Sequence, residues 1–207
     1  MTKEEAKSSI AYFMHRAYER GLTTSTGGNI SMRFGDVMLI TPSGKDKNSL
    51  TCEDIAEVDL STGENLTPEF KLSIETEMHR SVYLERADVN SVVHSHPTCC
   101  CLFSASEEKI DISLIAESWY LFGGRVDKAP YRLMGTKDLA DVVAEYVKNN
   151  DALLLEKHGA LAVGKTLLQA FDRIECLEQA AKMTYMAKAI KTVGLSTEEK
   201  HGIDCMK

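Results

Sequence analysis

The sequence predicts an α/β fold, a single three-layer domain in which helices flank a central and mainly antiparallel sheet. The 207 residues, 43% of them hydrophobic, suffice for one well-buried core but are few for two. Segments with a helical spacing of apolar residues alternate with short apolar segments typical of strands. We therefore expect one domain over residues 1–207, with a loosely ordered tail from about residue 194.

The first part of the chain predicts a helix followed by three short strands. Thr2 and Glu5 form a capping box, apolar residues follow at helical spacing, and Gly21 ends the helix. Two strand-like segments joined by Gly35-Asp36 predict a hairpin, and a third precedes a polar turn. The predicted strands cover residues 30–34, 37–41 and 55–60.

Helices and strands alternate in the remainder of the chain. One apolar strand ends near His94, and two more bracket His158. Thr166 and Gln169 form a capping box at the start of a long final helix with one apolar face. Between the short helix after His94 and about residue 132 the pattern is unclear. The other predicted helices cover residues 74–86, 98–104 and 136–148.

The charge pattern excludes several classes of partner. The chain has 31 acidic and 24 basic side chains, which give a net charge of −7, and the basic residues form no cluster. Nucleic acid and anionic membranes are therefore not expected as partners. No apolar stretch has the length of a membrane span, and the start Thr2-Lys3-Glu4-Glu5 does not resemble a signal peptide. We expect a cytoplasmic protein.

The six cysteines favour reduced thiols. Cys99, Cys100 and Cys101 are consecutive and the other three are scattered, which is unlike a disulfide scaffold. Thiolate ligation of a metal is an alternative for the triplet. A helix starting near Pro97 would turn the three thiols in different directions, so a packing role is preferred.

Two histidines at the end of an apolar strand are the most informative feature. Side chains alternate in an extended chain, so His94 and His96 lie on the same side. The candidate third ligand is His158, in a polar turn between two apolar runs, and Glu75 at a helix start is the fourth. Three imidazoles and a carboxylate suit Zn²⁺, with Mn²⁺, Co²⁺ or Fe²⁺ as alternatives. A structural histidine pair is the other interpretation of an isolated His-x-His.

Five motifs follow one another along the chain: Thr26-Gly27-Gly28-Asn29-Ile30-Ser31, Ile40-Thr41-Pro42-Ser43-Gly44, Ser73-Ile74-Glu75, His94-x-His96 and His158-Gly159. In this order and spacing they resemble the class II aldolase/adducin family, most closely its zinc-dependent fuculose-phosphate aldolase branch. The resemblance extends over nearly the full chain, to about residue 189. Separate motifs at matching spacing are far more specific than any single one.

The resemblance implies an enzyme with a metal centre. His94, His96 and His158 would be ligands, and Glu75 a movable fourth ligand and acid/base. The implied reaction is the reversible cleavage of a ketose 1-phosphate to dihydroxyacetone phosphate and an aldehyde, through a metal-stabilised enediolate. No Schiff-base lysine is needed. The resemblance also implies a homotetramer with active sites at subunit interfaces.

A site for the substrate phosphate is also implied by the resemblance. It would use backbone and hydroxyl donors, a neutral cradle that reconciles an anionic substrate with an acidic protein. Lys45, Lys71 and Lys157 are interpreted as solvated charges or substrate-loop contacts. Ordinary turn chemistry is the alternative for the glycines and serines. The residues of the implied phosphate site are Gly28, Asn29, Ser43, Gly44 and Ser73.

The chain departs from the aldolase pattern at two places. Ile74 stands where the phosphate loop of the family has a second serine, so one hydroxyl donor is absent. The catalytic tyrosine of the family lies before a Gly-Gly pair that resembles Gly123-Gly124, and here the matching position is Glu117, with Tyr120 close by. A carboxyl group at this position is similar to the sugar-phosphate dehydratase branch. A surface or interface role is the other interpretation of Glu117.

Other activities on this scaffold remain open. A pentulose-phosphate 4-epimerase would have aspartate in place of Glu75. A methylthioribulose-1-phosphate dehydratase and a sugar-acid phosphate decarboxylase are further alternatives. A non-catalytic adducin-like module would be expected to lack the metal ligands, which are all present. His15, His79 and His201 match no motif and are expected on helix surfaces or in the tail.

Overall fold

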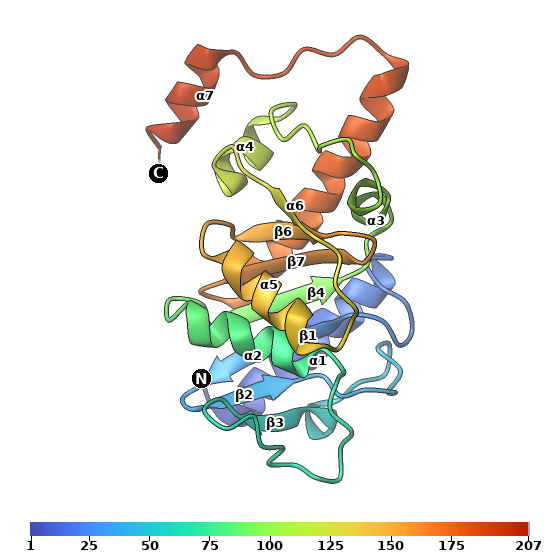
Figure 1. Cartoon of the computed structure of the whole chain (residues 1–207), viewed down its shortest axis with the longest axis vertical. Coiled ribbons are helices and arrows are strands. Elements are labelled where there is room, and N and C mark those ends of the chain that lie inside the picture. The colour runs from blue at the N-terminus through green and yellow to red at the C-terminus, as the bar shows by residue number, and fades with distance from the viewer. Residues whose placement is uncertain (207) are drawn as a thin grey trace.

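A single seven-stranded sheet runs through the middle of the protein (Figure 1). The computed structural model describes residues 1–206. The strand order is β3-β2-β1-β4-β7-β6-β5, in which only β5 and β6 pair in parallel. The predicted, mainly antiparallel sheet is therefore confirmed. The strands are β1 (Asn29–Phe34), β2 (Val37–Ile40), β3 (Ala56–Asp59), β4 (Ser91–Ser95), β5 (Asp127–Ala129), β6 (Ala152–Leu155) and β7 (Gly159–Gly164).

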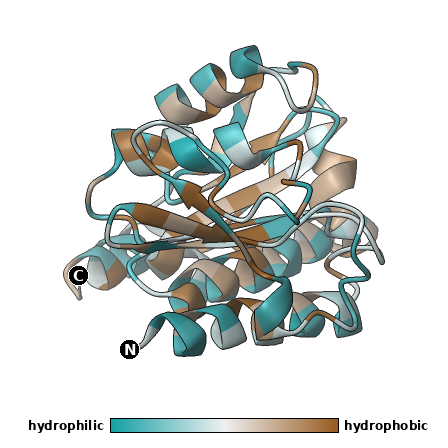
Figure 2. Ribbon diagram, turned by 90° about the horizontal axis from the view of Figure 1, so that it is seen from below, coloured by the Kyte–Doolittle hydropathy of each residue, from teal (hydrophilic) through white to brown (hydrophobic). Residues whose placement is uncertain are grey.

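Helices cover both faces of the sheet, which confirms the three-layer arrangement (Figure 2). One face packs against α1, α3 and α6, and the other against α2 and α5. Short 3₁₀ turns occur at Cys52–Asp54 and Ala187–Ala189. The helices in residues 1–206 are α1 (Lys3–Glu19), α2 (Thr76–Glu85), α3 (Thr98–Ser104), α4 (Ala116–Phe122), α5 (Lys137–Val147), α6 (Leu167–Met186) and α7 (Thr197–Asp204).

The central strand β4 is buried along its whole length because it has a helical layer on each side. Its side chains alternate, so Val93 joins the core formed with α1 and α6, and Val92 joins the core formed with α2 and α5. A strand buried on both faces is apolar throughout rather than alternating. His94, fully buried on the α2 side, is the one ionisable residue of β4, whose other polar residues are the serines at its two ends, Ser91 and Ser95.

Two segments contain structure that the sequence pattern did not predict. The unclear stretch before residue 132 contains α4 and the three-residue edge strand β5. The tail, for which we predicted loose order, contains α7, whose start is capped by reciprocal bonds of Ser196 and Glu199. Trp119 of α4 donates its indole N–H to Asp204 at 3.2 Å and lies under the ammonium of Lys200. Contacts between distant segments thus hold α7 against α4.

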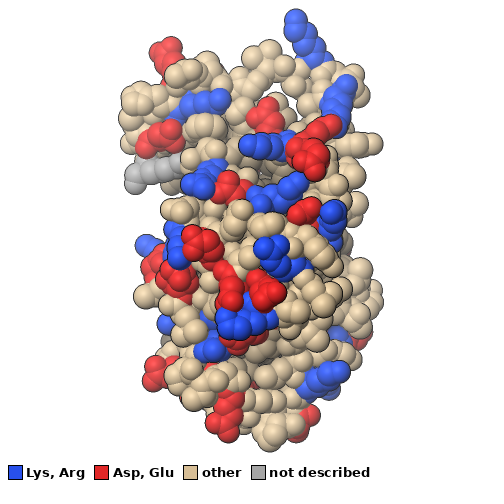
Figure 3. Space-filling view, in the orientation of Figure 1, with Lys and Arg blue, Asp and Glu red and all other residues tan. Residues whose placement is uncertain are grey.

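The surface carries both signs of charge. On the face shown in Figure 3, basic and acidic side chains are interspersed without a large patch of either. None of the helices in residues 1–206 has the length and apolarity that crossing a bilayer requires. Of the cysteine triplet, Cys100 is buried in the core and its two neighbours are half-buried, which is consistent with a packing role.

Candidate metal centre and substrate cavity

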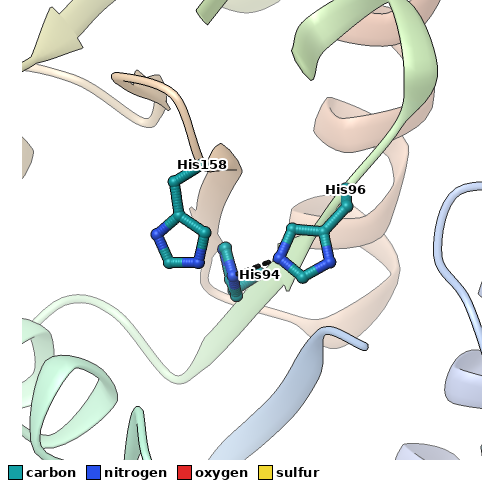
Figure 4. Close-up of side chains that lie close together, drawn as sticks. All are labelled: His94, His96 and His158. Carbon is teal, nitrogen blue, oxygen red and sulfur yellow. Dashed lines mark hydrogen bonds between the residues drawn. The ribbon is translucent and has the colours of Figure 1, made fainter. Parts of the chain in front are cut away.

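Three histidines from two separate segments converge at one end of the sheet (Figure 4). His94 lies near the end of β4, His96 follows it, and His158 occupies the turn between β6 and β7. Antiparallel pairing of β4 with β7 places this turn beside the end of β4. The candidate ligand nitrogens all lie within 4.8 Å of one another. The predicted grouping of the three side chains is therefore present.

The hydrogen bonding of His94 leaves a nitrogen free to bind a metal. Its Nδ1 lies 3.0 Å from the Ala160 carbonyl oxygen, which can only accept, so Nδ1 carries the proton. The lone pair of Nε2 then points to the cluster, 3.1 Å from Nε2 of His96. Burial lowers the pKa of His94 to about 3, and burial also lowers the pKa of His96. Both imidazoles are thus neutral, the form that ligates metals.

Glu75 completes the cluster from the start of α2. Only 5% of the residue is exposed, and its Oε1 and Oε2 lie 2.9 Å from Nε2 of His158 and 3.3 Å from Nε2 of His94. Asn29 donates to Oε2 at 2.8 Å. Burial raises the pKa of Glu75, but the contacts with His94, His158 and Asn29 outweigh it and hold this pKa well below its usual range. The carboxylate is therefore ionised.

The cluster fits a divalent cation. Oε1 of Glu75 is buried, and although Nε2 of His158 lies 2.9 Å away, no donor among the described residues has hydrogen-bond geometry to it. A cation beside it would satisfy this oxygen and the free imidazole lone pair of His94 together. Neutral imidazoles and one carboxylate are a donor set suited to Zn²⁺ and its neighbours in the transition series.

A cavity of about 470 Å³ opens beside the histidines. Four of the five residues predicted for phosphate line it, and the fifth, Gly44, adjoins the lining residue Ser43. Asn29 donates to Ser73 Oγ at 3.0 Å as well as to Glu75, so one amide joins the predicted phosphate loop to the carboxylate. The predicted residues in the lining are Gly28, Asn29, Ser43 and Ser73.

Two glycines allow the close backbone approach at this cavity. Gly28 has a φ of +64°, and a Cβ there would lie 2.8 Å from the carbonyl oxygen of His94. A Cβ on Gly159 would lie 2.5 Å from the carbonyl oxygen of Ser95 and 2.8 Å from the ring of His96. No larger residue fits at either position without moving the histidine strand.

Comparisons with known proteins assign this chain to a family. The model of the class II aldolase and adducin N-terminal domain matches residues 8–185. This chain belongs to the class II aldolase and adducin family. That family is metal-dependent, and His94, His96 and His158 form a possible three-residue metal site. The resemblance seen in the motifs is confirmed.

Relatives and solved structures agree with this assignment. L-fuculose phosphate aldolase of Escherichia coli (strain K12) is 35% identical over 173 residues, 82% of this chain and 78% of that protein. A 5-deoxy-D-ribulose 1-phosphate aldolase of Bacillus thuringiensis serovar kurstaki is 34% identical over 204 residues, 97% and 93% of the two chains. A solved structure of an L-fuculose 1-phosphate aldolase has a TM-score of 0.86 at 30% identity, and covers 98% and 95% of the two chains. The predicted enzyme class, a class II aldolase and carbon–carbon lyase, is confirmed.

The departures from the aldolase pattern lie in different places. Ile74 lines the cavity and is 55% exposed, so an apolar side chain stands where the family has a hydroxyl. Glu117 is exposed on α4 and does not line this cavity. Tyr120 lines another cavity of about 520 Å³, together with Arg86 and Arg173. The structure of one chain therefore does not bring Glu117 or Tyr120 to the histidines.

His79 is a residue for which the prediction was wrong. We expected it on a helix surface or in the tail, but it is fully buried. It lies four residues after the N-cap Glu75, hence on the same side of α2, where it contacts Asn29 and Ser31 of β1. The spacing Glu75-x-x-x-His79 was the signal that could have revealed it.

The buried His79 belongs to a directional chain of hydrogen bonds. Its Nε2 lies 2.6 Å from Oδ1 of Asn29 and must donate, because that oxygen only accepts. Its Nδ1 then accepts from Ser31 Oγ at 2.7 Å, and Ser31 Oγ lies 2.8 Å from the Tyr83 hydroxyl. Burial lowers the pKa of His79 to about 3, so the imidazole is neutral as this chain requires. The amide of Asn29 is thereby oriented with its N–H groups toward Glu75 and Ser73.

We expect His79→Leu to lower the free energy of unfolding by about 2 kcal/mol, because it leaves two buried polar atoms without their partner. Urea denaturation monitored by circular dichroism measures this change. Tyr83→Phe is the matched control, since it leaves His79 and Asn29 in place and removes only the hydroxyl at the far end of the chain, at a cost of about 1 kcal/mol. Equal denaturation midpoints for His79→Leu and the unmodified protein would contradict the expectation.

Proposed function

We propose that this protein is a zinc-dependent aldolase that reversibly cleaves a ketose 1-phosphate, similar to fuculose 1-phosphate, to dihydroxyacetone phosphate and an aldehyde. The observation that carries the proposal is the convergence of His94, His96, His158 and Glu75 beside a cavity lined by the phosphate-loop residues. The relatives named L-fuculose phosphate aldolase and 5-deoxy-D-ribulose 1-phosphate aldolase support the substrate class.

His94, His96 and His158 would hold the metal, with Glu75 as a fourth and movable ligand. The bound cation would supply Lewis acidity, which stabilises negative charge on oxygen and is worth several kcal/mol in such reactions. Zn²⁺ is the preferred metal for this donor set, and Mn²⁺, Co²⁺ and Fe²⁺ are the alternatives. Buried, neutral imidazoles favour ligation over protonation at neutral pH.

The substrate phosphate would bind in the loops that carry Gly28, Asn29, Ser43, Gly44 and Ser73. Breaking the C3–C4 bond leaves an electron pair on the three-carbon fragment. Glu75, after taking up a proton from water, would deliver the proton that C3 gains. Asn29 would keep the carboxylate in place between phosphate loop and histidines, since its amide donates to both Ser73 and Glu75. The cavity of about 470 Å³ has the size of a small-ligand site.

The C4 hydroxyl must lose a proton as the aldehyde forms. In this proposal Glu117 of a second copy accepts it, with Tyr120 as the alternative group. Glu117 is exposed on α4 and absent from the lining of the cavity in its own chain, which is compatible with a role across a subunit interface. We accordingly propose a homotetramer with interfacial active sites, formed by a single domain over residues 1–207, and a cytoplasmic location.

Product analysis tests this function. Metal-loaded protein is incubated with fuculose, rhamnulose, ribulose and 5-deoxypentulose 1-phosphates and with ribulose 5-phosphate, and the products are identified by chromatography and mass spectrometry. The expected result is dihydroxyacetone phosphate from at least one ketose 1-phosphate, which disappears when a chelator removes the metal. An isomer of unchanged mass would instead mean an epimerase, loss of water a dehydratase, and loss of carbon dioxide from an acid substrate a decarboxylase. No reaction and no bound metal would favour an adducin-like module.

A further inference from the structure

A buried lysine lies in the wall of the substrate cavity. Lys47 is only 2% exposed, yet it lines the same cavity as Asn29, Ser43 and Ser73. Its ammonium donates to the carbonyl oxygen of Pro42 at 3.0 Å. Its backbone N–H donates to the carbonyl oxygen of Ser25 at 2.8 Å. Both ends of the residue are thus held at the loops that border the cavity.

The charge of Lys47 has no counterion in the described part of the chain. None of the ion pairs among residues 1–206 includes it, and the Pro42 carbonyl is the one hydrogen-bond acceptor found there for its three N–H donors. Burial lowers the pKa of Lys47 to about 8, so the ammonium is still protonated at neutral pH. An unpaired buried charge is costly, and a ligand of opposite charge would relieve that cost.

None of Lys45, Lys157 and Arg173 is both buried and without a counterion. Lys45 pairs with Asp54 at 3.0 Å, and Lys157 pairs with Glu156 at 3.2 Å, and both side chains are more than half exposed. Arg173, a buried cation that lines a different cavity, is also paired, with Asp151 at 2.5 Å. Lys47 is the buried cation left unpaired beside the predicted phosphate loop.

We propose that the Lys47 ammonium binds the phosphate group of the substrate. The inference deepens the proposed function and rests on it for the identity of the phosphorylated ligand. Pro42 immediately precedes Ser43, so the bond from Nζ to the Pro42 carbonyl holds the ammonium at the loop that would cradle the phosphate. The phosphate site is then positively charged rather than a neutral cradle of backbone and hydroxyl donors. Two free N–H donors of the ammonium would bind phosphate oxygens.

The test measures binding of inorganic phosphate to the metal-loaded protein by isothermal titration calorimetry. Lys47→Met removes the charge and keeps the length of the side chain. Lys45→Met is the matched control in the same loop. We expect Lys47→Met to weaken phosphate binding about tenfold or more, Lys45→Met to change it less than about twofold, and Lys47→Arg to restore part of it. With a cleaved ketose 1-phosphate, Lys47→Met should raise KM far more than it lowers kcat.

A purely structural role predicts a different pattern. In that case Lys47→Met would lower the denaturation midpoint while phosphate affinity stays equal in both methionine variants, and the proposal would be overturned. Loss of phosphate binding in Lys47→Met with an unchanged or higher midpoint is the expected result, because removal of an unpaired buried charge does not destabilise. A third outcome separates the two proposals. If no ketose phosphate is cleaved but phosphate binding still depends on Lys47, the role of Lys47 is supported and the proposed aldolase activity is rejected.

Discussion

Glu75→Gln is expected to lower kcat for dihydroxyacetone phosphate formation by at least about a hundredfold, because an amide cannot exchange the proton that C3 gains. The substitution keeps the size of the side chain and its place between Asn29 and His158, so folding should be retained. A coupled assay for dihydroxyacetone phosphate, run on metal-loaded protein, measures kcat and KM separately.

Glu77→Gln is the matched control for this experiment. Glu77 lies two residues further along, in the first turn of α2, where its side chain is 46% exposed and paired with Arg80. Its replacement should leave kcat within about twofold, since surface pairs contribute little to a protein's energetics. If Glu75→Gln were as active as Glu77→Gln, the assignment of Glu75 as acid/base would be wrong.

His158→Ala is expected to remove both the metal and the activity. The unmodified protein should retain about one divalent cation per chain after dialysis, measured by inductively coupled plasma mass spectrometry, and His158→Ala far less than one. Activity should fall by more than about a hundredfold, because loss of even an outer-shell partner costs 10- to 100-fold. His158 lies in a turn rather than in the core, so the fold should tolerate its replacement.

His15→Ala is the control for loss of a histidine as such. His15 lies on α1, where it contacts Glu19 and the Asn48 carbonyl, and no part of it belongs to the histidine cluster. This variant should retain metal and activity. Metal retention by His158→Ala equal to that of His15→Ala would rule out His158 as a ligand.

Local patterns were sufficient to predict most of the helices and strands, α4, β5 and α7 excepted, and the pair of histidines on one strand. The spacing of apolar residues, together with the capping box at Thr2 and Glu5, predicted α1, which begins and ends within two residues of the expectation. The alternation of side chains in an extended segment predicted that His94 and His96 lie on the same side. These features depend on residues close together in the chain, and so they can be read directly from it.

Local sequence patterns did not predict which polar side chains are buried. His79 and Lys47 are both buried among segments distant in sequence. The four-residue spacing from Glu75 was the one local signal for His79, and the residues around Lys47 offer none. His79 gained its neighbours when α2 packed against β1, and Lys47 when its loop closed on the segment around Ser25. Environment, rather than residue type, makes one a hydrogen-bond relay and the other an unpaired cation.

By itself, then, the sequence determined the α/β class, the strands of the sheet other than β5, the pair of histidines on one strand and, through its ordered motifs, the family. The tertiary structure decided which distant groups meet: the order β1-β4-β7 brings Asn29 and the His158 turn to the end of β4, and α2 brings Glu75. It also left Glu117 away from this cavity and packed α7 against α4. The physical reason is that periodicity and capping are local, whereas strand order and the burial of charge depend on the whole packed chain.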